Sequence, residues 1–147
     1  MDLHNIFIQA HRGFAYLELL LVAVFIVALF VSMMAQAGKI SKLLRKSTFF
    51  VMIFFHIQLL VGLTMLFFTS SFMSAVNQIG MVGLMSNPES RFSYIEHPFS
   101  MLITAILMTI INKKVKTAET ISGGIRFLAI LALVLFFYAI PFDKLFG

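Results

Sequence analysis

The sequence contains no cysteine, and this absence excludes several kinds of site. Without thiols there is no disulfide framework, no thiolate metal site, no cysteine nucleophile and no covalent attachment of c-type haem. A GxSxG nucleophile motif and a glycine-rich phosphate-binding loop are missing as well. Hydrolytic chemistry is therefore not indicated, and we predict no catalytic residue.

Charged residues are scarce too. Only 12% of the 147 residues are charged and 61% are hydrophobic, and the mean hydropathy is +1.01. Because a soluble domain has roughly 25% charged residues, this chain has too few for a surface that faces water. The first apolar run is also too long for the hydrophobic part of a cleavable signal peptide. The composition predicts an all-α integral membrane protein.

Four apolar segments are long enough, or nearly long enough, to cross a bilayer. A spanning helix needs about 20 residues for a hydrocarbon core of roughly 30 Å. The segments are residues 14–35, 48–68, about 92–112 and 125–140. Short connections between them predict one domain, residues 1–147, folded as an up-down four-helix bundle.

The basic residues predict the orientation of this bundle. Two loops contain most of them: Lys39, Lys42, Arg45 and Lys46 after the first segment, and Lys113, Lys114 and Lys116 after the third. The positive-inside rule places both loops in the cytoplasm. Both termini and the 70–91 loop then face outside (N-out, C-out), as in a multi-pass protein of the bacterial inner membrane. Topology thus explains the net charge of +5, and nucleic-acid binding is not indicated.

A few polar side chains interrupt the apolar spans or lie at their edges: His11, Glu18, His56, Gln58, Glu96 and His97. Ionisable groups are costly at membrane depth and therefore mark candidate functional sites. Histidine has a further meaning, because neutral imidazole is the commonest ligand of metals and of haem iron. We expect the function to depend on these groups.

Depth along the helices decides which of these groups can meet. Measured from the inner ends of the spans, His56 lies roughly 12 Å deep, His97 roughly 22 Å and Glu18 roughly 25 Å. We therefore expect Glu18 and His97 to be neighbours on the outer side with His11, while His56 lies nearer the inner half. Glu18 either ties helices together, with a histidine or Arg91 as its partner, or takes part in proton transfer.

Three segments carry a resemblance to known proteins: HRGFAYLELL in the first span, FFHIQLLVGL in the second and RFSYIEHPFSM in the third. Together they resemble small four-span bacterial membrane proteins known as cytochrome-b-like, over residues 11 to 116. The resemblance implies a bundle in the inner membrane that holds haem b through histidines on facing helices. His56 and His97 are then the preferred ligands of the haem iron, and His11 is the alternate.

Three functions remain open at this point. The first is a haem-b protein that passes electrons to or from a quinone or a redox partner. The second is a non-catalytic accessory or assembly subunit of a larger membrane complex, in which the histidines only join helices. The third is a small protein that handles protons or a metal with Glu18, His11 and His97. Other membrane subunits or further copies of the chain are the expected protein partners.

Overall fold

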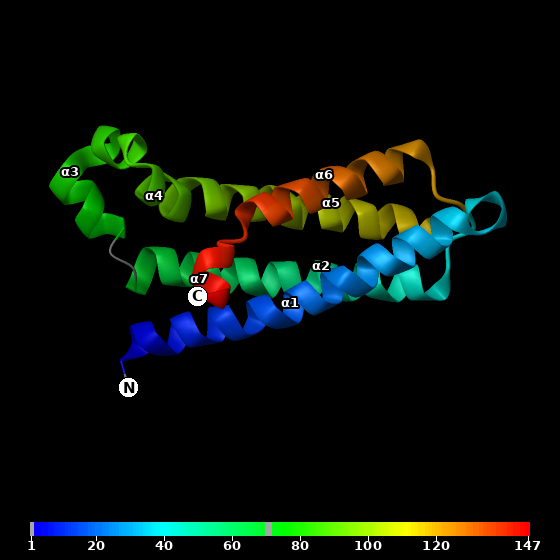
Figure 1. Cartoon of the computed structure of the whole chain (residues 1–147), viewed down its shortest axis with the longest axis horizontal. Helices are drawn as coiled ribbons and strands as arrows, with labels where there is room; N and C mark the ends of the chain where they lie inside the picture. The colour runs from blue at the N-terminus through cyan, green and yellow to red at the C-terminus, as the bar shows by residue number, and fades with distance from the viewer. Residues whose placement is uncertain (1, 70–71) are drawn as a thin grey trace.

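The computed structural model describes residues 2–69 and 72–147, and these residues are almost entirely helical (Figure 1). The α-helices are α1 (Leu3–Met34), α2 (Lys42–Thr64), α3 (Phe72–Ser86), α4 (Pro88–Arg91), α5 (His97–Thr117), α6 (Gly123–Ala139) and α7 (Phe142–Phe146). A 3-10 turn follows α1, and wider π-helical turns follow α2 and precede α5. The prediction of an all-α protein is confirmed.

Within the part of the chain that the structure describes, three helical stretches are long and apolar enough to cross a membrane: Leu3–Met34, Lys42–Phe68 and Pro88–Thr117. They contain the first three predicted spans, except for Ala35 at the end of the first, and indicate a membrane protein. The fourth predicted span corresponds to α6, which is apolar but has only 17 residues. At 1.5 Å per residue this helix is about 25 Å long, a few ångströms less than the hydrocarbon core.

The first helix begins earlier than its apolar run predicts. α1 starts at Leu3 instead of residue 14, because the segment before Gly13 contains no proline and continues the helix. Its 32 residues extend about 48 Å, which is longer than a bilayer core. His11 is therefore held on a regular helix, two turns before Glu18.

Pro98 shapes the start of the third span. Proline has no N–H to donate, so the carbonyl one turn earlier loses its usual partner. The chain adapts with a wider π-helical turn, Phe92–Glu96, and the N–H of His97 bonds to the carbonyl of Phe92. The helical stretch therefore runs from Pro88 to Thr117, and His97 lies in its interior.

The predicted outer loop, residues 70–91, is mostly helical. Its first two residues, Ser70 and Ser71, lie outside the described residues. α3 bends at Gly80, whose φ of 67° is in the left-handed region that favours glycine. Asn87 caps α4 by accepting a hydrogen bond from the N–H of Ser90. Figure 1 shows α3 beyond one end of the long helices and α4 in line with α5.

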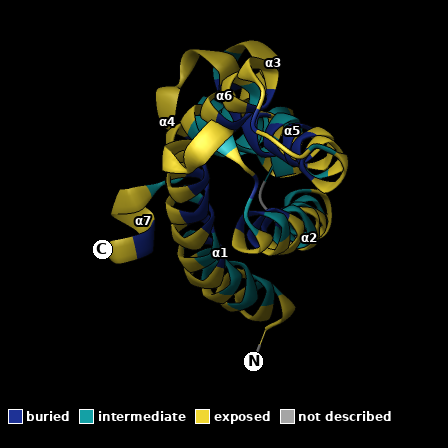
Figure 2. Ribbon diagram, turned by 90° about the vertical axis from the view of Figure 1, so that its right-hand side faces the viewer, coloured by how far each residue is buried: buried dark blue, intermediate teal, exposed yellow. Residues whose placement is uncertain are grey.

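The long helices pack in the order α1, α2, α5, α6, and each runs opposite to the one before it (Figure 1). Their inward faces hold large buried side chains such as Phe25, Phe55 and Phe136. Their outward faces consist largely of exposed residues, drawn in yellow in Figure 2, and many of these residues are large and apolar. Such an apolar exterior is unusual for a soluble monomer and is what a lipid environment requires.

The two basic loops are joined to each other by backbone hydrogen bonds. The N–H of Ile40 donates to the carbonyl of Glu119 at 2.9 Å, and the N–H of Ile121 donates to the carbonyl of Gly38 at 2.9 Å. Nearby, the guanidinium of Arg45 donates to carbonyls at the C-terminal end of α5, those of Val115, Lys116 and Ala118. We call this connected region the loop end of the bundle.

Candidate functional site

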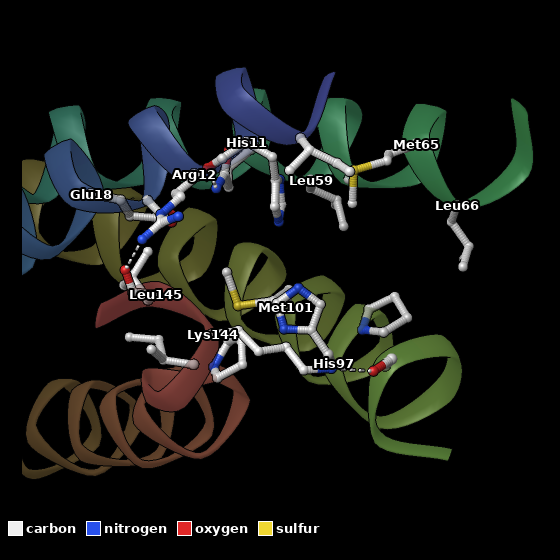
Figure 3. A pocket seen from close by; sticks show the side chains of 18 of the residues that line it. His11, Arg12, Glu18, Leu59, Met65, Leu66, His97, Met101, Lys144 and Leu145 are labelled. Carbon is white, nitrogen blue, oxygen red and sulfur yellow. Dashed lines mark hydrogen bonds between the residues drawn. The ribbon is translucent and has the colours of Figure 1, made fainter. Parts of the chain in front are cut away.

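A cavity of about 350 Å³ lies between the α1–α2 side and the α5–α6 side of the bundle, away from the loop end (Figure 3). Its walls come from α1, α2, α5, α6, the neighbouring π-helical turns and the C-terminal segment, and most of the lining side chains are apolar. Small-molecule sites in proteins typically have volumes of roughly 300–1,000 Å³. The cavity is therefore large enough to be a candidate binding site.

His11 of α1 and His97 of α5 project into the cavity from opposite sides (Figure 3). The centroids of their rings are 6.0 Å apart, and the ring planes cross at 82°. The Nδ1 of His97 donates to the carbonyl of Ala139 at 2.7 Å. This bond fixes the tautomer, because a carbonyl can only accept, and leaves Nε2 of His97 as the nitrogen with a lone pair.

The position of His11 depends on α2. The side-chain amide of Gln58 donates to the carbonyl of His11 at 2.8 Å. Gly62 leaves room for the imidazole, since a Cβ at this position would lie 3.3 Å from Cε1 of His11. The Nδ1 of His11 is buried and has no hydrogen-bond partner among the described residues. His11 therefore has a buried, unpaired ring nitrogen in the cavity wall, on the ring edge that faces Gly62.

Two further side chains place buried oxygens in the cavity wall. Glu18 is 2% exposed and Gln58 is 3% exposed, and both line the cavity. One Oε1 on each has no partner within residues 2–69 and 72–147. A buried polar atom without a partner costs roughly 1–3 kcal/mol, and such atoms usually bond to water or a ligand. These oxygens are candidates to bind a molecule in the cavity.

The C-terminal segment covers one flank of the cavity. After α6 ends, the chain turns at Pro141, and α7 lies beside α1 (Figure 1). The carbonyl of Leu145 accepts hydrogen bonds from the guanidinium of Arg12, at 2.9 Å, and from the hydroxyl of Tyr16. Lys144 also lines the cavity, so the C-terminal segment is part of the site.

The fold brings together four of the predicted site residues, His11, Glu18, Gln58 and His97, and it does not add His56 to them. His56 is exposed; its Nδ1 donates to the carbonyl of Met52 at 2.7 Å, and its Nε2 lies 3.4 Å from the hydroxyl of Thr109.

His56 lies outside the cavity because of the way α2 is rotated about its own axis. Gln58 faces the cavity, and residues two apart on a helix point about 200° apart, so His56 faces outward. The predicted ligand pair of His56 and His97 is thus not the pair that the fold juxtaposes. The opposed imidazoles belong to the alternate, His11, and to His97.

Glu96 is not among the residues that line the cavity. Its carboxylate accepts hydrogen bonds from Nε of Arg91 at 2.7 Å and from the hydroxyl of Tyr138 at 2.6 Å. Arg91, which the sequence offered as a partner for Glu18, therefore pairs with Glu96 instead.

Sequence reasoning missed the contribution of the C-terminal segment to the site. Pro141 ends the fourth apolar run, and it was the only sequence signal that the chain turns there. That Lys144 and Leu145 return to α1 could not be read from spacing, because the return depends on contacts with Arg12 and Tyr16.

The described residues contain no group of three or more His, Asp or Glu side chains that could hold a metal ion. The cavity offers a metal two imidazoles, so the remaining ligands would have to come with the metal. Comparison of the chain with models of protein families, with curated proteins and with solved structures finds no match.

Proposed function

We propose that this protein is an electron carrier of the bacterial inner membrane that binds haem b between His11 and His97. The observation that supports this most directly is the opposed pair of imidazoles, with ring centroids 6.0 Å apart. Bonds between metals and imidazole nitrogens are about 2 Å long, so a metal ion between two imidazoles sets their centroids about 6 Å apart.

The surrounding residues fit this cofactor. A porphyrin supplies four ligands of its own, which matches a lining that offers two imidazoles to a metal. The hydrogen bond from Nδ1 of His97 to the Ala139 carbonyl is the kind that orients a metal-binding histidine. Apolar walls, including Leu59, Met101 and Phe136, suit a flat macrocycle.

Each part of the chain then has a defined task. His11 and His97 bind the iron, Gln58 and Gly62 hold His11 in position, and the Ala139 carbonyl orients His97. The apolar walls exclude water. Haem, when bound, supplies a one-electron couple whose potential depends on its axial ligands and on burial.

The proposal includes a topology of four spans with both termini outside. α6 is the fourth span, and a slightly thinner local bilayer accommodates its shorter length. The two basic loops meet at the loop end, which is cytoplasmic in this arrangement. The cavity then lies in the outer half of the bundle, and the haem exchanges electrons with a membrane quinone or a redox partner there.

The deciding experiment is the reduced-minus-oxidised absorption spectrum of protein purified from haem-replete cells. We expect a b-type spectrum that His11→Ala and His97→Ala each reduce by about tenfold or more, as loss of a ligand should. The matched control is His56→Ala, which removes an imidazole from the outward face and should leave the spectrum intact. A featureless spectrum of the native protein would refute haem binding.

The hydrogen bonds of Gln58 and His97 between helices favour one other function, that of a non-catalytic accessory subunit. Gln58 joins α2 to α1, and His97 joins α5 to the end of α6, so both contacts could serve only to fix the bundle. This alternative predicts stoichiometric partner subunits after purification in mild detergent. It also predicts that His97→Ala lowers stability without the loss of any cofactor.

A further inference from the structure

We propose that Arg12 and Lys144 bind the two carboxylates of the haem and thereby fix its orientation in the cavity. This inference rests on the proposed function and assigns a role to the C-terminal segment. We call these two residues the cationic pair. The carboxylates then point toward the flank that α7 covers.

The first argument is the placement of the cationic pair. Arg12 follows His11 directly in α1, and Lys144 belongs to α7 on the side of the cavity that carries His97. Figure 3 shows the guanidinium of Arg12 directed at Leu145, on the α1 side of the cavity, and the side chain of Lys144 on the side of His97. A flat ligand between the imidazoles therefore has a positive charge at its edge from both walls.

The second argument is that Arg12 keeps unused hydrogen-bonding capacity. Its Nη2 donates to the Leu145 carbonyl at 2.9 Å in a partly buried contact. The ion pairs of the described residues are Arg91–Glu96 and Lys144–Glu89, so Arg12 has no carboxylate partner among them. A guanidinium has several N–H donors in a fork that matches a carboxylate. Most of this fork remains available to a ligand.

The third argument concerns Lys144, whose present partner holds it weakly. Its Nζ lies 3.2 Å from a carboxylate oxygen of Glu89 and 3.4 Å from the hydroxyl of Ser93. The side chains of Lys144 and Glu89 are 51% and 80% exposed. Exposed ion pairs contribute only about 0–1 kcal/mol. Exchanging Glu89 for a ligand carboxylate therefore costs little.

The fourth argument is that the backbone of α7 is fixed beside the cavity. Leu145 is only 6% exposed, and its carbonyl accepts from both Arg12 and Tyr16. This anchor holds the neighbouring Lys144 at the cavity wall. Glu18, which would repel a carboxylate, lies six residues from Arg12, roughly 9 Å along the helix. The flank under α7 is thus the favourable place for two negative groups.

The test compares two probes, haem and haem dimethyl ester, which has the same iron and macrocycle but no ionisable carboxylate. Both are titrated into full-length protein purified without haem from haem-deficient cells. We expect the native protein to prefer haem over the ester by at least about tenfold. Arg12→Gln and Lys144→Gln should each reduce the preference roughly tenfold, the effect of one charge-assisted hydrogen bond. Affinity for the ester should change little.

Controls separate charge in the cavity from charge elsewhere. Lys113→Gln and Arg126→Gln remove exposed cations that do not line this cavity, and the preference should stay at its native value. Arg12→Lys keeps the charge and should retain part of the preference. Helix content measured by circular dichroism checks that each variant is folded.

The outcomes distinguish this inference from the function on which it rests. Equal affinity of the native protein for both probes overturns the role of the cationic pair and leaves haem binding intact. Binding of neither probe overturns both proposals. Equal loss of both probes in Arg12→Gln shows that Arg12 acts only by anchoring Leu145, which also overturns its assignment to a carboxylate.

Discussion

The imidazole of His11 fits in the cavity wall because the facing residue of α2, Gly62, has no side chain. Gly62 of α2 lies against it, and an added Cβ would be 3.3 Å from Cε1 of His11, closer than ordinary van der Waals contact. Gly13 of α1 is a useful comparison, because nothing lies within 4 Å of the Cβ that an alanine would add there. The two glycines occupy similar positions inside long helices but differ in what surrounds them.

We therefore expect opposite responses to the same substitution. Gly13→Ala should raise stability by about 1 kcal/mol, because alanine has the better helix propensity. Gly62→Ala should gain less or lose stability, and it should weaken haem binding because it displaces His11. Thermal unfolding in detergent and a haem titration measure the two effects. Identical behaviour of both variants would contradict this account.

Glu18 and Gln58 form a second contrast at the residue scale. Each is buried with one unpaired oxygen, but only Gln58 also donates a bond between helices, to the His11 carbonyl. Glu18→Leu removes a buried polar group without breaking a hydrogen bond found among the described residues, so the haem-free protein should be as stable or more stable. Gln58→Leu should cost about 1 kcal/mol. Chemical denaturation of both proteins tests this order.

At the scale of elements, Arg45 connects the start of α2 to the end of α5. Its guanidinium donates to three carbonyls that the helix end leaves without intrahelical partners. Arg45→Met should destabilise the protein by about 2 kcal/mol, because bonds from a charged donor are stronger than neutral ones. Lys46→Met, next to it and exposed, should change stability by less than about 0.5 kcal/mol. Comparable losses in both would show that Arg45 acts only through its charge.

The elements also show how far the sequence could predict this molecule. Apolar run length located the helices, since burial in lipid requires a continuous apolar stretch. It did not locate the start of α1, because helix formation does not stop where the apolar run stops. Basic loops and distance along the helices predicted that Glu18 and His97 lie at similar depth, and both line one cavity.

The sequence could not predict how α2 is rotated about its axis, and therefore which of its polar residues face the cavity. Spacing along α2 gives the depth of His56 and Gln58 but not which of them faces α1, because that depends on how neighbouring helices pack. One signal was present: the two polar residues are two positions apart and point about 200° apart, so both could not face the same cavity. The return of α7 to Arg12 is a tertiary contact with no local pattern.

At the scale of the whole molecule, the proposed topology can be tested with single cysteines, because the native chain has none. Lys46→Cys and Asp143→Cys both place a thiol at an exposed position, at the loop end and in α7. A membrane-impermeant maleimide added to intact cells should label Asp143→Cys and should not label Lys46→Cys until the membrane is opened. Protection of both positions would mean that α6 does not cross.

The hydrogen bonds of the loop end make the two ends of the bundle different. Backbone bonds between residues 38–40 and 119–121, together with Arg45, join the two halves at the loop end. At the other end a cavity lies between the halves, and the hydrogen bonds from Arg12 and Tyr16 to Leu145 tie α1 to α7 on one flank of it. We therefore expect the loop end to be the more rigid end of the bundle. For the proposed function, this predicts that a flat molecule dissolved in the bilayer enters at the cavity end while the loop end preserves the helix register. Amide hydrogen exchange should accordingly be slow at the loop end and faster at the cavity end.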